Sequence, residues 1–126
     1  MPGSHPVLAG VLAGCMSLSG CGSAGEGEGA SVTGGDSTRG VAAISKYGCG
    51  SCHTIPGITG AHGLVGPPLA GIGTRVYLGG VLPNMPSNMM RWIRDPVGVD
   101  EKTAMPNLGV TEKDAADIAA YLYTAK

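Results

Sequence analysis

The sequence predicts a small all-α domain in residues 37–126, with about three to four helices joined by long loops. Three observations lead to this expectation. Apolar residues recur at helical spacing in three separate stretches. No convincing stretch of four or more residues alternates between apolar and polar side chains, so no sheet is expected. The stretches between the expected helices are rich in glycine and proline, which predicts loops.

The first helix is expected to begin in the polar residues 36–38 and to stop at Gly48. Val41, Ile44 and Tyr47 recur at a spacing that places them on one helical face. The residues that follow Gly48 would therefore lie on a turn at the end of this helix.

The second helix is expected to begin at Ser87, which is a favourable N-cap residue. It should end at Asp95, because Pro96 cannot continue a helix. Its apolar side chains are Met89, Met90, Trp92 and Ile93.

The third helix has the clearest pattern. Thr111 can cap its start, Glu112 and Asp114 suit the positive end of the helix, and Thr111 with Asp114 approximates a capping box. One face carries Ala115, Ile118, Ala119 and Leu122.

The loops and the lean core of the domain both point to a bound group. Two long connections read GITGAHGLVGPPLAGIG and VGVDEKTAMPNLG, and loops of such length in a compact domain usually have a functional reason. The chain has no phenylalanine and one tryptophan. A small domain with so little aromatic material often depends on a metal, a disulfide or a cofactor.

The first 36 residues divide into two zones. Residues 1–20 contain an apolar run of signal-peptide length that is too short to span a membrane. Cys15 and Cys21 each follow a triplet that resembles the bacterial lipoprotein signal, and Cys21 is preferred because it leaves the full apolar run upstream. An ordinary cleaved signal, or a disulfide between the two cysteines, is the simpler alternative. Residues 21–36, rich in Gly, Ser and Glu, are expected to form a flexible linker.

This N-terminus predicts export to the periplasm or the outer face of the cytoplasmic membrane, with a lipid anchor at Cys21. The formal net charge of −1 argues against a nucleic-acid partner, which would require a basic surface.

The stretch Cys49-Gly50-Ser51-Cys52-His53 carries the chemistry. A zinc site would need four ligands, for which His62 would have to join Cys49, Cys52 and His53, although the adjacent Cys52 and His53 could hardly reach one tetrahedral ion. A redox-active dithiol would be expected in a βαβ context, which the sequence does not predict. The third interpretation uses every residue: both thiols form thioethers with a haem c, and the histidine ligates its iron.

A second axial ligand has several candidates. His62 follows His53 by a loop that is too short to cross to the other face of the ring. Methionines on the second helix are more typical of core packing. Met105 is preferred because it lies on a loop stiffened by Pro106. The candidates weighed for this position are His62, Met85, Met89, Met90 and Met105.

Residues 40–124 resemble class I, single-haem c-type cytochromes, and are similar above all to the cytochrome c domain of haem–copper oxidase subunit II. The segments that carry this resemblance are CGSCH, GPPLAGIG, MMRWIRDP, TAMPNLG and IAAYL. The resemblance implies that the Pro67 carbonyl accepts a hydrogen bond from His53, that Arg75 pairs with a haem propionate, and that Trp92 packs against the haem on the methionine side. A solvated Arg75 and a Trp92 that serves only core packing stay open as alternatives.

A haem ligated by His53 and Met105 has no open position for a substrate, which favours one-electron transfer over catalysis. The expected protein is a membrane-tethered shuttle or an electron-input subunit of a respiratory chain, and not an enzyme by itself. Its partners would be redox proteins such as a terminal oxidase or a quinol–cytochrome c reductase. The alternatives are a ligand-binding, sensing or catalytic haem protein with a displaceable Met105, and a subunit in which haem serves only the fold.

Overall fold

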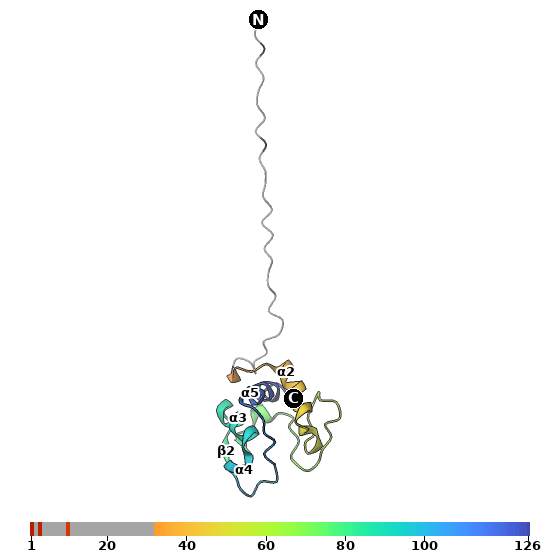
Figure 1. Cartoon of the computed structure of the whole chain (residues 1–126), viewed down its shortest axis with the longest axis vertical. Coiled ribbons are helices and arrows are strands. Elements are labelled where there is room, and N and C mark those ends of the chain that lie inside the picture. Colours follow the sequence, from red (N-terminus) through yellow and green to blue (C-terminus); the bar gives the residue numbers. More distant parts are fainter. Residues whose placement is uncertain (2, 4–9, 11–31) are drawn as a thin grey trace.

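The computed structural model describes residues 1, 3, 10 and 32–126. The predictions for the signal zone and for most of the linker, including Cys15 and Cys21, therefore lie outside the described residues. Figure 1 shows the described domain as a cluster of short helices and long loops around the C-terminal helix. Along the described chain, no helix is both long and apolar enough to cross a membrane.

The domain is mainly helical, which confirms the predicted fold class. The helices are α2 (Ser37–Lys46), α3 (Pro86–Arg94), α4 (Pro96–Val99) and α5 (Glu112–Leu122), and the shorter 3-10 turns are η1 (Cys49–Ser51) and η2 (Ile72–Thr74). The strands β1 (Tyr77–Leu78) and β2 (Leu82–Pro83) form an antiparallel pair. The expectation of no sheet was therefore wrong, because a pair of two-residue strands is too short to leave an alternating pattern.

Helix α2 begins and ends close to where the sequence predicts. The carboxylate of Asp36 accepts a hydrogen bond of 2.8 Å from the backbone N–H of Arg39 and so caps the helix. At the other end, Gly48 adopts a left-handed conformation with φ of 70°, which suits glycine and turns the chain into η1.

Helix α5 begins after Thr111, whose hydroxyl accepts a hydrogen bond of 3.1 Å from the backbone N–H of Asp114, as the sequence predicts. In a full capping box the Asp114 carboxylate would also accept from the backbone N–H of Thr111. Here that carboxylate makes tertiary contacts instead. The Asp114 carboxylate accepts hydrogen bonds from the Tyr47 hydroxyl at 2.7 Å and the Lys46 ammonium at 3.0 Å, and these tie the end of α2 to the start of α5.

Helix α3 begins one residue before the predicted N-cap. Pro86 occupies the first turn, where its missing N–H costs nothing, and Met85 takes the cap position that was expected for Ser87. The helix ends before Asp95, and the chain then starts α4, in which the Asp95 carboxylate accepts a hydrogen bond of 3.0 Å from Gly98. This four-residue helix was not expected from the sequence.

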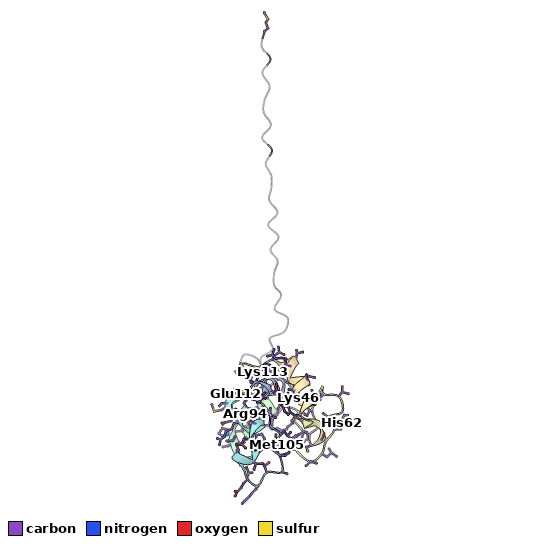
Figure 2. The ribbon with its side chains drawn as sticks, in the orientation of Figure 1. Lys46, His62, Arg94, Met105, Glu112 and Lys113 are labelled. Atoms are coloured by element: carbon purple, nitrogen blue, oxygen red, sulfur yellow. The ribbon has the colours of Figure 1, made fainter. Side chains whose placement is uncertain are left out.

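The core forms where α2 crosses α5, with α3 packed against α5 from the other side (Figure 1). Gly40 allows the close crossing, because a Cβ atom there would overlap the backbone carbonyl of Asp117. The largest fully buried apolar side chains are Ile44, Leu78, Met89 and Ile118. At the surface, Nη1 of Arg94 at the end of α3 lies 4.0 Å from Oε2 of Glu112 at the start of α5, and both residues are labelled in Figure 2.

Candidate functional site

An apolar cavity of about 750 Å³ lies beside this core. Such a volume is in the range of small-molecule and cofactor sites. Its walls come from the end of α2, the turn at η1, the loop before η2, β1, α3, the loop before α5 and α5 itself. Of the described residues that line it, Arg75 alone carries a formal charge, so the cavity is suited to a large apolar group with few charged contacts.

One wall of the cavity is the turn that carries Cys49, Cys52 and His53. Backbone N–H groups of Cys52 and His53 both donate to the carbonyl of Cys49, at 3.2 and 3.1 Å, and hold the turn closed. Both cysteines are half-buried free thiols. Burial raises the pKa of the Cys49 thiol, since the charged thiolate is disfavoured away from water.

The imidazole of His53 is held in one tautomer. Its Nδ1 lies 2.7 Å from the carbonyl oxygen of Pro67. Because a carbonyl oxygen only accepts, Nδ1 must carry the proton and donate it, which leaves Nε2 with the lone pair that can bind a metal. Gly66 fixes the ring from another side, because a Cβ atom at this position would overlap the imidazole. The contact with Pro67 is therefore the one that the resemblance implied.

Met105, labelled in Figure 2, lies on the loop before α5. It borders the same cavity. Its backbone N–H donates a hydrogen bond of 3.1 Å to the Thr103 hydroxyl, which orders the loop on the N-terminal side of the residue. Pro106 follows directly and restricts the backbone on the other side. The side chain is half-buried, so the structure brings Met105 and His53 to one cavity.

The other candidate axial ligands are placed differently. Among the residues described along the cavity, neither His62 nor Met85 appears, and Met85 is 55 % exposed. His62 is exposed on the loop after His53, away from Met105 (Figure 2). Met89 borders the cavity but is also part of the core, at 2 % exposure, and Met90 packs against that core.

Arg75 and Trp92 both border the cavity. The guanidinium Nη2 of Arg75 donates to the carbonyls of Pro68 and Ala70, so part of its donor capacity is used by the chain itself. Trp92 is half-buried, and its ring lies on Gly79, where a Cβ atom would come within 2.5 Å of the ring carbons. The ring contacts of Gly66 and Gly79 were not expected, because nothing in the local sequence indicates which distant side chain lies against either glycine.

These residues fit a haem-binding site. The cavity is apolar and large, one histidine presents a free Nε2, one methionine supplies a thioether, and two thiols lie on the histidine side. A zinc site fits less well, because the described part of the chain holds no cluster of three or more His, Cys, Asp or Glu residues able to bind a metal ion.

Comparison with known proteins agrees with this assignment. Residues 37–126 match the family model for cytochrome c, and the chain belongs to the cytochrome c family. It is also 32 % identical over 89 residues to a protein named cytochrome c oxidase subunit 2 from Alkalihalophilus pseudofirmus. That match covers 70 % of this chain and 25 % of the relative, so the chain spans about a quarter of the relative's length. No solved structure matches the chain. Membership of this family indicates haem binding and electron transfer between redox partners.

Proposed function

We propose that this protein is a one-electron carrier with a single covalent haem c, whose iron is ligated by His53 and Met105. The observation that carries the proposal is the meeting of Cys49, Cys52, His53 and Met105 at one apolar cavity. A haem bound there would accept one electron from a donor and pass it to an acceptor.

Residues of the chain would attach the haem and ligate its iron. Cys49 and Cys52 would each add sulfur to a vinyl group of the haem, with the thiol hydrogen going to the neighbouring carbon, so the attachment needs no oxidant. His53 would bind through Nε2, because Nδ1 is held by Pro67. Ligation by Met105 within an apolar wall would favour the reduced state and raise the reduction potential.

Redox partners would contact the exposed rim of the cavity. Val65, Tyr77 and Leu108 border the cavity and are 74, 57 and 42 % exposed. A small apolar rim of this kind suits the brief contacts of electron-transfer proteins. A terminal oxidase or a quinol–cytochrome c reductase is the proposed kind of partner, and the name of the 32 % identical relative, an oxidase subunit, supports the oxidase.

A membrane tether completes the proposal. The sequence at Cys21 supports lipid attachment after export, which would hold the domain in the periplasm or at the outer face of the cytoplasmic membrane. Intact-mass measurement of the mature protein tests this part together with the covalent haem. A mature chain that begins at Cys21 and carries haem and acyl chains is expected; one without haem or without acyl chains would contradict the corresponding part.

Axial ligation is tested by carbon monoxide binding to the reduced, haem-loaded protein. We expect no change in the visible spectrum of the original protein and rapid binding in Met105→Ala, because that substitution removes a ligand from the iron. Met85→Ala is the matched control, since Met85 is exposed and lies outside the described cavity lining. Rapid binding by the unsubstituted protein would instead identify a ligand-binding or sensing haem protein.

A further inference from the structure

A half-buried asparagine outside the cavity ties together three parts of the fold. The side-chain amide of Asn84 donates to the backbone carbonyls of Ile72 and Arg75, each at 2.8 Å. Its oxygen accepts a hydrogen bond of 2.9 Å from the Tyr123 hydroxyl, just after α5. The amide therefore holds both ends of the turn at η2 and joins that turn to the C-terminal segment.

The C-terminal segment also packs directly on this turn. The backbone N–H of Gly71 donates to the carbonyl of Ala125 at 2.9 Å. A Cβ atom at Gly73 would lie 3.0 Å from the Cα and Cδ1 atoms of Tyr123, so backbone and ring fit closely there. The Tyr123 hydroxyl is the donor in its contact with Asn84, and burial raises its pKa further from neutral pH.

The turn at η2 is also connected, through side-chain contacts, to His53, the proposed iron ligand. Arg75 follows η2, and its guanidinium donates to the carbonyls of Pro68 and Ala70. Pro67 directly precedes Pro68 in this loop, and its carbonyl oxygen accepts a hydrogen bond from Nδ1 of His53. A continuous series of contacts therefore runs from Tyr123 through Asn84 and Arg75 to the loop that fixes the imidazole.

We propose that Asn84, anchored by Tyr123, is a positioning residue for His53. It sets the backbone of Arg75, the Arg75 side chain then holds the loop that carries the Pro67 carbonyl, and this carbonyl fixes the tautomer and orientation of the ring. The inference rests on the proposed function only in that His53 is the residue that binds iron. The competing interpretation is that Asn84 stabilises the fold as a whole, without any particular effect at His53.

Hydrogen exchange measured by NMR on the reduced, haem-loaded protein separates these interpretations. The probes near the site are the Nδ1 proton of His53 and the amide protons of Gly66 and Leu69, which lie on either side of Pro67 and donate to the carbonyls of Cys52 and Thr54. The probes for global opening are the amide protons of Ile44 and Ile118, in the core where α2 crosses α5.

In Asn84→Ala, we expect the site probes to exchange at least about fivefold faster, the factor that corresponds to the net loss of one hydrogen bond (~1 kcal/mol), with a smaller change at the core probes. Tyr123→Phe, which removes only the hydroxyl, should give a weaker effect of the same pattern. Thr111→Ala is the control, because it removes a cap of similar energy at the other end of α5. It should affect all probes together.

Equal acceleration of site and core probes in Asn84→Ala and Tyr123→Phe, or unchanged exchange at the site, would overturn the inference. If Asn84→Ala yields no folded protein, the comparison in Tyr123→Phe decides alone. An unsubstituted protein without haem would contradict the proposed function but not this inference, since the amide protons of Gly66 and Leu69 report on the loop in either form.

Discussion

Replacing Asp117 by asparagine should remove a pH-dependent part of the stability of this domain. Asp117 lies on α5 and is 1 % exposed. Its carboxylate accepts hydrogen bonds from the Arg39 guanidinium at 2.9 and 3.0 Å, from the Lys113 ammonium at 2.9 Å and from the backbone N–H of Asp36 at 2.7 Å. It thus joins α2 and the residue before it to α5.

The magnitude follows from the ionisation of this group. The hydrogen bonds from Arg39, and then those from Lys113 and Asp36, lower the pKa of Asp117 from 3.8 to about 2, against the opposing effect of burial. With about 1.4 kcal/mol for each tenfold change in acidity, the lowered pKa corresponds to ~2 kcal/mol of folding stability. Because the pKa is lower in the folded state, this stabilisation is fully present above about pH 4 and is lost as the pH falls through about 2.

Urea unfolding of the haem-loaded protein, followed by the circular dichroism of its helices, measures the effect between pH 6 and pH 2. We expect the original protein to be more stable than Asp117→Asn at pH 6, and the difference to shrink by ~2 kcal/mol by pH 2. Other acids, including Asp114, titrate in both proteins and do not enter this difference. Glu101→Gln, which alters an exposed carboxylate, serves as the control. A difference that is the same at both pH values would refute the reasoning.

Three further substitutions test the packing. Gly66→Ala should reduce the haem content per protein, measured by absorbance, because the new methyl group would overlap His53; full loading with an unchanged spectrum would contradict this. Gly40→Ala should lower the free energy of unfolding by about 1–3 kcal/mol in urea, because the methyl group would overlap the carbonyl of Asp117, and unchanged stability would mean that α2 can shift freely. Thr111→Ala should lower the free energy of unfolding by about 1 kcal/mol in urea, because the backbone N–H of Asp114 loses its acceptor; unchanged stability would mean that the cap contributes nothing.

The helices could be predicted because their signals are local. Thr111 caps α5 by accepting a hydrogen bond from a residue three positions later. Gly48, two residues after the end of α2, takes the left-handed conformation that glycine adopts easily. The start of α3 was misplaced at Ser87 because the preference of Pro86 for the first helical turn was given too little weight. Helix α4 and the pair β1 and β2 are too short for any periodic pattern, and they depend on tertiary contacts for stability.

In the site, too, the residues that are close in sequence could be predicted and the contacts between distant segments could not. Cys49, Cys52 and His53 lie within five residues of one another, so their chemistry is visible in the sequence. Their link to Pro67 could be expected only from the resemblance to a family. Asn84 and Tyr123 are separated by 39 residues, and nothing in either local sequence indicates their hydrogen bond. Such polar contacts between distant segments appear only once the backbone has been placed.

The glycine-rich loops illustrate why composition alone is an ambiguous guide. Glycine in a loop suggests flexibility, yet here aromatic rings lie directly on glycine residues. The imidazole of His53 lies on Gly66, and the Trp92 ring lies on Gly79, so a methyl group at either position would push a ring out of place. Both rings border the cavity. The missing side chains therefore let backbone and ring meet in van der Waals contact, so glycine at these two positions makes room for a ring.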